Sequence, residues 1–162
     1  MILVLDASPL ITLARIGSLD LLRQLAGQII IPDAVYAESV SLAQCRPGSI
    51  EIAQASWITH RTVVNRVRVE QLHTRIGLGE AEAIILAGEI GFDAIVVLDD
   101  ATARRIAEQE GCRVVGLLGL LVMAKQRGLL AAVRPLLDAM RSSGFFVSDD
   151  LYTIILRQGA EE

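Results

Sequence analysis

Short apolar runs alternate along this chain with longer stretches of helical periodicity. The apolar runs predict strands at 2–5, 29–31, 57–59, 94–98 and 113–115. The helical patterns predict helices at 8–16, 19–25, from 33 onward, and at 49–55, 80–89, 101–110, 117–127, 131–140 and 149–156. The apolar runs do not alternate with polar residues, as is typical of strands buried on both faces. Strands separated by helices therefore predict an α/β fold with a central parallel sheet covered by helices on both sides.

Residues next to these patterns indicate where helices begin. Ser8 and Pro9 predict the start of the first helix, with Ser8 as its N-cap and Pro9 in its first turn. Asp33 begins the helix that follows the second strand. One of the pair Asp99 and Asp100 is expected to cap the helix at 101–110, which leaves the other for a different role.

Length and composition indicate a single folded domain over residues 1–162, with the C-terminal helices at about 117–158 packed on it. Apolar residues make up 52% of the chain and charged residues 21%, which excludes the composition of a disordered protein. The longest uncharged apolar stretch, 114–124, is shorter than the roughly 20 residues of a membrane-spanning helix. The first residues have no basic region of the kind that begins a signal peptide. We therefore expect a cytoplasmic protein without a membrane partner.

The net charge of −4 disfavours unspecific binding to duplex nucleic acid, because proteins that bind it by charge alone are basic. One stretch, 61–75, is locally basic, and within it only Glu70 opposes the arginines.

Acidic residues follow the predicted strands. Asp6 comes directly after the first strand, and Asp99 and Asp100 follow the fourth. Glu38 lies in the helix after the second strand, and Glu80 begins the helix that leads to the fourth. Because the carboxyl ends of parallel strands meet at one edge, where ligands bind in such sheets, we expect these acids to lie together. Clustered carboxylates repel one another unless a cation neutralises them, and Mg²⁺ prefers such oxygen ligands. The pattern therefore predicts metal-assisted phosphodiester hydrolysis.

Helix geometry separates Glu80 from Glu82. Two residues apart on a helix, they point about 200° apart and cannot face the same pocket. Glu80 shares its helix face with small apolar residues such as Ala83, which indicates the side facing the sheet. Glu82 shares its face with Glu89, so we expect it to be solvated, and Glu80 is the site candidate.

Four motifs support a family resemblance. In chain order they are Asp6-Ala7-Ser8, Ile31-Pro32-Asp33-Ala34-Val35-Tyr36-Ala37-Glu38, Gly79-Glu80-Ala81-Glu82-Ala83 and Val97-Leu98-Asp99-Asp100. Together they resemble the PIN-domain family, most closely its DUF3368-type prokaryotic branch, which is related to VapC-like toxin ribonucleases. The likeness covers nearly the whole chain.

The resemblance implies a three-layer α/β/α PIN-like domain with a central parallel sheet of four to five strands. It further implies a Mg²⁺- or Mn²⁺-dependent endoribonuclease that cleaves single-stranded RNA, as the toxin of a toxin–antitoxin pair. The family's catalytic, metal-binding acids fall on Asp6, Glu38, Glu80 and either Asp99 or Asp100. Typical members have aspartate at the third of these positions, so Glu80 is one methylene longer.

The expected partners are single-stranded RNA, an antitoxin protein and a second copy of the chain. Basic side chains must then flank the acids to hold the RNA phosphates, and the candidates are Arg61, Arg66, Arg68, Arg104 and Arg105. The last two are adjacent in a predicted helix, so they point about 100° apart and at most one faces the site.

Two alternatives remain open at the level of the sequence. One is a catalytically silent PIN-like module that binds nucleic acid or protein. The other is a receiver-like signalling domain, which shares a parallel sheet with acids at its rim. A receiver needs an acidic pair after the first strand and a lysine after the fifth. Here a single acid, Asp6, follows the first strand, and the only lysine, Lys125, lies well beyond the fifth.

Overall fold

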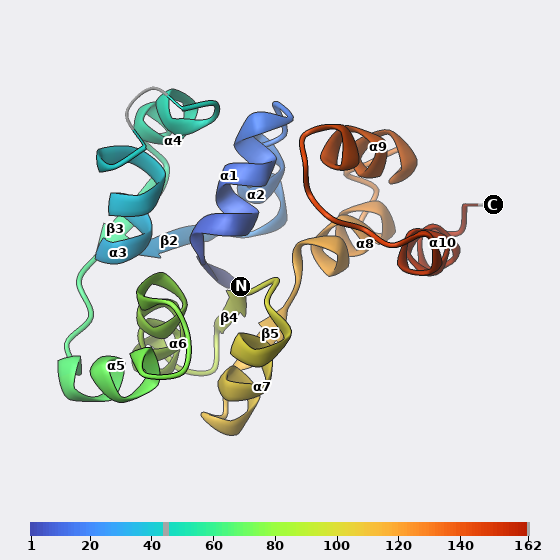
Figure 1. Cartoon of the computed structure of the whole chain (residues 1–162). Helices are drawn as coiled ribbons and strands as arrows, with labels where there is room; N and C mark the ends of the chain where they lie inside the picture. Colours follow the sequence, from blue (N-terminus) through green and yellow to red (C-terminus); the bar gives the residue numbers. More distant parts are fainter. Residues whose placement is uncertain (44–45, 162) are drawn as a thin grey trace.

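The computed structural model describes residues 1–43 and 46–161, and within them the strands form one five-stranded, all-parallel sheet (Figure 1). The strands are β1 (Ile2–Leu5), β2 (Gln28–Pro32), β3 (Ile58–Arg61), β4 (Ala94–Val97) and β5 (Arg113–Val115). Their order across the sheet is β3-β2-β1-β4-β5. The predicted α/β class and parallel sheet are therefore confirmed.

The central strand β1 pairs with β2 on one side and with β4 on the other. Leu3 lies opposite Ile29 and Ile95, and Leu5 lies opposite Val97. The strand order reverses at β1, and in open parallel sheets ligands bind at such a point. A receiver domain has the order 2-1-3-4-5 instead, so the strand order excludes the receiver-like alternative.

Helices cover both faces of the sheet. In chain order they are α1 (Ala7–Arg15), α2 (Asp20–Leu25), α3 (Asp33–Tyr36), the π-helical turn η1 (Ala37–Ser41), α4 (Ser49–Gln54), α5 (Arg66–His73), α6 (Leu78–Ile90), α7 (Ala101–Gln109), α8 (Leu117–Gln126), α9 (Arg134–Ser142) and α10 (Asp149–Gln158). Successive side chains of a strand point to opposite faces. Leu3 and Leu5 accordingly pack with α1, α2 and α8–α10, whereas Val4 packs with α5–α7. In the part of the chain that is described, no helix is both long and apolar enough to cross a bilayer.

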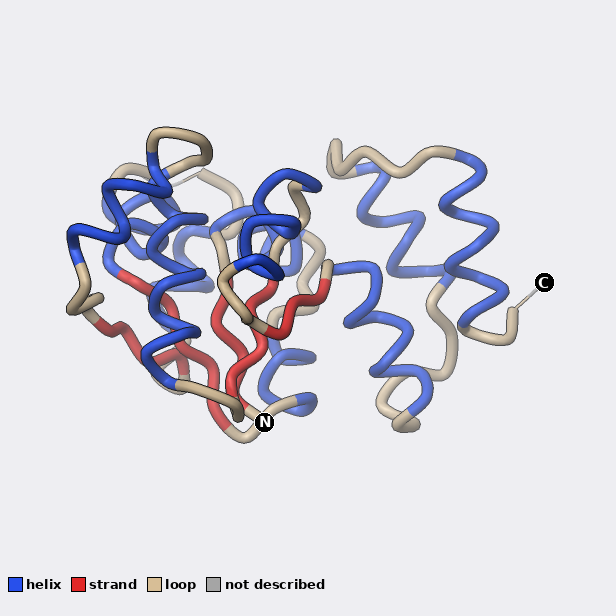
Figure 2. Tube along the Cα trace, turned by 90° about the horizontal axis from the view of Figure 1, so that it is seen from below, coloured by secondary structure: helices blue, strands red, loops and turns tan. Residues whose placement is uncertain are grey.

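The three C-terminal helices form a group to one side of the sheet (Figures 1 and 2). Leu121 of α8, Leu137 of α9 and Leu156 of α10 are buried in the same apolar cluster as Leu10 of α1 and Leu22 of α2. Between α9 and α10 the chain crosses from 143 to 148, and this loop approaches the edge of the sheet where the strands end.

Three local predictions differ from the structure. The first helix begins at Ala7, so Asp6 and not Ser8 occupies its N-cap position. Glu38 lies in the single π-helical turn η1, and such turns are frequent at functional sites. Helix α5 was not predicted, because only Val69 and Leu72 of its eight residues are buried and the apolar pattern is weak.

Candidate functional site

The predicted site acids lie at the carboxyl edge of the sheet, around its central strands. Asp6 follows β1 and is only 8% exposed. Its backbone N–H donates to the carbonyl of Val97 at 3.2 Å, which places the end of β1 beside the end of β4. Asp99 and Asp100 follow at the next positions after Leu98. The reversal of strand order thus brings two acidic segments together that are distant in sequence.

Glu38 reaches the same place from η1. A Cβ atom added at Gly79, in the first turn of α6, would lie 3.0 Å from Oε1 of Glu38 and 3.1 Å from Oδ1 of Asp6. Both carboxylates therefore converge on the backbone at the start of α6, and only glycine leaves room for them there. Gly79 is a site residue that the acid pattern alone did not identify, although it stands directly before Glu80 in the sequence.

Glu80 is half-buried and belongs to the same group of charges. The charges of Asp100 and Glu38 raise the pKa of Glu80, in addition to the larger effect of burial. Its Oε2 accepts a hydrogen bond from the N–H of Gly77 at 2.9 Å, which caps α6 and opposes the rise. Glu80 therefore lies near two of the other predicted acids, Glu38 and Asp100.

The electrostatics of the group favour bound protons or cations. Burial raises the pKa of Asp6 to about 7, reinforced by the negative charges of Glu80 and Glu38 and opposed by the N–H groups of Ala7 and Ser8. Burial also raises the pKa of Glu38. Carboxylates kept from water and near one another hold a proton more tightly, and a divalent cation relieves the same repulsion.

Asp99 and Asp100 have different partners. Asp100 is the N-cap of α7 and accepts from the N–H of Ala103 at 2.8 Å, as expected for one of the pair. Asp99, the other member of the pair, also has a backbone partner: its Oδ1 accepts a hydrogen bond from the N–H of Leu117 at the start of α8, also at 2.8 Å. Burial raises the pKa of Asp99, against the effects of the Leu117 amide and of Arg104. Its Oδ2 is buried with no hydrogen-bond partner in the described structure.

The donor set suits a hard divalent cation in its chemistry, because it consists of carboxylate oxygens at the edge where such sheets bind ligands. Within residues 1–43 and 46–161, however, no three His, Cys, Asp or Glu side chains are arranged as a ready ligand group. Glu80, Asp99 and Asp100 instead accept backbone hydrogen bonds from Gly77, Leu117 and Ala103. The residues fit a cation by type and location, and binding one requires some of these side chains to exchange partners.

The prediction that Glu82 is solvated is wrong. Its side chain is 3% exposed, and it pairs with Arg66 at 2.6 Å. It also accepts from the N–H of Ala34 at 2.7 Å. Helix α6 is covered on several sides by the sheet, α3 and α5, so a charged residue on the face away from Glu80 is buried as well. Glu82 thereby fixes the start of α3, the segment that continues into Glu38.

The predicted basic stretch is less available than its sequence indicates. Arg66 pairs with Glu82, and Arg68 pairs with Glu110, through its Nε at 3.2 Å and through Nη2. Both acids come from distant parts of the chain, which a count of charges within 61–75 misses. Arg61 is exposed at the end of β3.

The two adjacent arginines of α7 behave differently, as their helical spacing predicts. Arg104 is half-buried, and its Nη1 donates to the carbonyl of Asp99 at 2.7 Å and of Leu98 at 3.4 Å. Arg105 is exposed. Arg104 is therefore the member of the pair that lies beside the acids.

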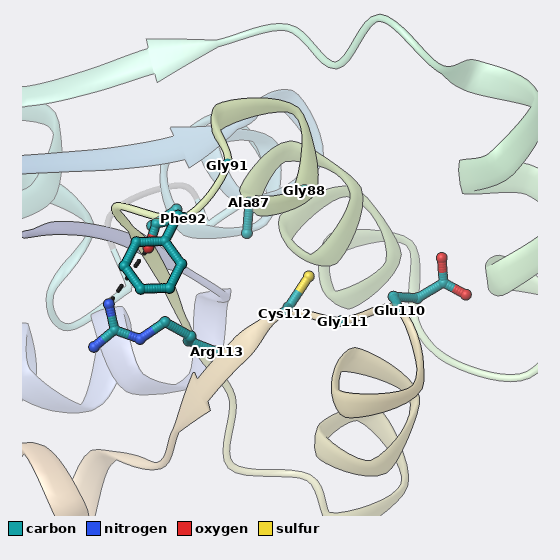
Figure 3. A pocket seen from close by; sticks show the side chains of 9 residues that line it. Ala87, Gly88, Gly91, Phe92, Glu110, Gly111, Cys112 and Arg113 are labelled. Atoms are coloured by element: carbon teal, nitrogen blue, oxygen red, sulfur yellow. Dashed lines mark hydrogen bonds between the residues drawn. The ribbon is translucent and has the colours of Figure 1, made fainter.

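A separate cavity of about 270 Å³ lies at the opposite, amino edge of the sheet, between the ends of α6 and α7 (Figure 3). Glu110, Cys112 and Arg113 line it together with Phe92. The Arg113 guanidinium lies 5.4 Å from the centre of the Phe92 ring, and Nη1 donates to the Phe92 carbonyl at 3.4 Å. None of the predicted site acids lines this cavity, so it is distinct from the acid group.

Comparison with known proteins connects this geometry to one family. A family model described as DUF3368, PIN domain, matches residues 2–161. No curated protein is significantly similar to the chain in sequence.

Proposed function

Since the chain belongs to the DUF3368 family of PIN domains, we propose that it is a divalent-metal-dependent endoribonuclease that cleaves single-stranded RNA. PIN domains are typically nucleases, which supports hydrolysis of a phosphodiester bond. The observation that carries the proposal is the convergence of Asp6 and Glu38 on Gly79, beside Glu80 and Asp100, with the pKa of Asp6 raised to about 7. A purely structural role does not require such costly crowding of acids.

In this proposal the five acids have different roles. Asp6 and Glu38 both approach Gly79 and form the centre of the cation site. Glu80 and Asp100 complete it from the starts of α6 and α7, and Asp99 stands behind them on the Leu117 amide. A bound Mg²⁺ or Mn²⁺ would polarise the phosphoryl group and lower the pKa of the attacking water. The carboxylates would hold and orient that cation, whose charge offsets the burial and the repulsion that raise the pKa of Asp6 in its absence.

A catalytically silent RNA-binding module is the second candidate. The observation that favours it is that Glu80, Asp99 and Asp100 all accept backbone hydrogen bonds that a ligand role would have to weaken or replace. A role as the toxin of a toxin–antitoxin pair, with an antitoxin protein or a second copy as partner, is a further part of the proposal. It rests on the family's relation to toxin ribonucleases.

The test is cleavage of a labelled single-stranded RNA, first in EDTA and then with Mg²⁺ or Mn²⁺. We expect activity with either ion, none in EDTA, and loss of activity in Asp6→Asn. Asp93→Asn is the matched control, because Asp93 is exposed in the loop before β4 at the other edge of the sheet. The same ions should raise the melting temperature, since a ligand at 100 times its Kd contributes about 2.7 kcal/mol. RNA binding without cleavage under any of these ions would establish the silent module instead.

A further inference from the structure

Resting on the proposed function, we propose that the RNA strand follows a groove between the sheet edge and the 143–148 loop. In this groove Phe146 stacks on a base, and Arg104 and Arg15 contact phosphates on either side of the acids. This path differs from the basic stretch at 61–75, where Arg66 and Arg68 are already paired with carboxylates.

Two adjoining cavities form the groove. The first, of about 280 Å³, is lined by Asp99, Arg104, Phe145 and Phe146 among others. The second, of about 290 Å³, has Ser8, Arg15 and Phe145 in its wall. Phe145 lines both cavities, so they meet at this ring. Asp99 lines the first cavity, and Ser8, two residues after Asp6, lines the second, so the groove borders the acid group on the side of α1 and α8.

The loop holds Phe146 outward in a fixed setting. Arg141 donates through Nη2 to the carbonyl of Val147 and to Oδ1 of Asp149, each at 2.8 Å. Val147 is buried, and the N–H of Phe145 donates to the carbonyl of Met140 at 3.0 Å. Phe146, between these two anchored residues, is 86% exposed. A ring presented in this way offers a face for stacking with little further ordering of the chain on binding.

The guanidinium groups of Arg104 and Arg15 are oriented by hydrogen bonds to backbone carbonyls, which do not neutralise their positive charge. Arg104 donates to the carbonyls of Asp99 and Leu98, and Nε of Arg15 donates to the carbonyl of Pro47 at 3.5 Å. In the described structure neither arginine has a carboxylate within salt-bridge distance. Phosphates can therefore be contacted without breaking an existing ion pair.

The combination favours single-stranded RNA over other occupants. Every base has a π-face that stacks on an aromatic ring whatever its identity, and each linkage carries a phosphate for an arginine. An apolar protein surface would use Phe146 but not the flanking guanidinium groups. Phe92, the other strongly exposed phenylalanine, lies at the opposite edge, away from the acids, with the Arg113 guanidinium 5.4 Å from its ring centre.

The experiment measures binding of a short fluorescein-labelled single-stranded RNA by anisotropy, in Ca²⁺ to suppress cleavage. Phe146→Ala should weaken binding about 5- to 10-fold, the lower end of the loss for one stacked base, and Phe146→Trp should restore it. The slope of log affinity against log salt should not change, because Phe146 contacts no phosphate. Phe92→Ala is the matched control and should bind as the wild type does.

The arginines are tested through the salt dependence. Arg104→Gln and Arg15→Gln should each reduce the slope by about 0.7, the value for one phosphate contact on a single strand. Thermal melting of each variant establishes that it is folded. Because the hydrogen bond of the Arg15 side chain within the described residues goes to the Pro47 carbonyl, away from the acids, Arg15→Gln keeps the test valid even if Arg104→Gln destabilises the site.

Several outcomes would refute the proposal that RNA follows this groove. Wild-type affinity in Phe146→Ala, or unchanged slopes in both arginine variants, would remove these residues from the RNA path. A change from dimer to monomer in Phe146→Ala, seen by sedimentation with RNA affinity intact, would show that the ring meets a second copy instead. Failure of the proposed function is distinct, because a wild type that never cleaves RNA can still bind it through Phe146.

Discussion

Replacing Asp6 with asparagine should stabilise the metal-free protein at neutral and alkaline pH, but not at acidic pH. Asp6 is 8% exposed, and its pKa in the folded chain is raised from 3.8 to about 7 by burial and by the charges of Glu80 and Glu38. Between these two values the folded chain holds a proton that the unfolded chain has lost. Stability therefore falls as the pH rises through this range, and the loss is complete above about pH 7.

The magnitude follows from the size of the shift. Each pKa unit corresponds to 1.36 kcal/mol, so a shift of about 3 units costs the wild type up to about 4 kcal/mol at alkaline pH. Asparagine removes this cost because its side chain carries no charge. Its amide interacts less favourably than a carboxylate with the nearby N–H groups of Ala7 and Ser8, which offsets about 1–2 kcal/mol. The expected net gain for Asp6→Asn is about 2 kcal/mol near pH 8, against a small loss near pH 4.

The assay is urea unfolding in EDTA at several pH values, for the wild type and for Asp6→Asn. The change in their difference between pH 4 and pH 8 is the decisive quantity, since effects of the substitution on packing cancel in it. Asp93→Asn, an exposed control, should show no such change. Saturating Mg²⁺ or Mn²⁺ should reverse the order at pH 8, because the wild type then gains binding energy that the variant lacks. A difference between the two proteins that is independent of pH in EDTA would refute the electrostatic argument.

Three further predictions concern the surroundings of the acids. Glu82→Gln should lower the free energy of unfolding by about 1–3 kcal/mol through loss of its charged hydrogen bonds, whereas Glu80→Gln should abolish RNA cleavage with little effect on urea unfolding. Equal effects of the two changes on both measurements would contradict their assignment. Gly79→Ala should diminish both cleavage and the metal-induced rise in melting temperature, because its methyl group would lie 3.0 and 3.1 Å from two site carboxylate oxygens. Gly88→Ala, where an added Cβ meets nothing within 4 Å, is the control on the same helix and should be neutral or stabilising. Finally, Glu161 accepts hydrogen bonds from N–H groups at the start of α9, and these bonds lower its pKa to about 2. The ionised Glu161 therefore stabilises the folded chain above about pH 4.5, and this contribution is lost as the pH falls toward 2. Glu161→Gln should therefore flatten acid unfolding in this range, and an unchanged acid transition would argue against the network.

Much of the fold was predictable because its signals are local. The run 2–5 has no polar residue, as a strand covered on both faces requires, and the glycines and acids after each run indicate where strands and helices end. The same pattern predicts Asp6 at the carboxyl edge of the sheet, whereas the strand order that places it beside Asp99 and Asp100 comes from the structure. Helix α5 was missed because it buries only Val69 and Leu72. Two buried positions are too few to give its sequence a clear helical pattern of apolar residues.

The sequence predicted that these acids lie near one another, but it did not predict the hydrogen bonds and ion pairs that they form. Helix spacing placed Glu80 toward the other acids, but the same argument assigned Glu82 to solvent, because it assumes that a helix has one covered face. The partner of Arg68 is Glu110, 42 positions away, and that of Arg66 is Glu82, 16 positions away. Pairings of this kind depend on how elements pack, and periodicity within a segment carries no information about them.

The central position of β1 has a consequence for the order in which the protein becomes functional during its synthesis. Chains are synthesised from the N-terminus, so β1 and β2 leave the ribosome early. The other neighbour of β1 is β4, whose Ala94 pairs with Ile2, and Asp99 finds its amide partner only when Leu117 has been added. The acids cannot assemble on a shorter nascent chain. The complete group of acids, on which the proposed activity depends, therefore forms only after β4 and the start of α8 have emerged from the ribosome.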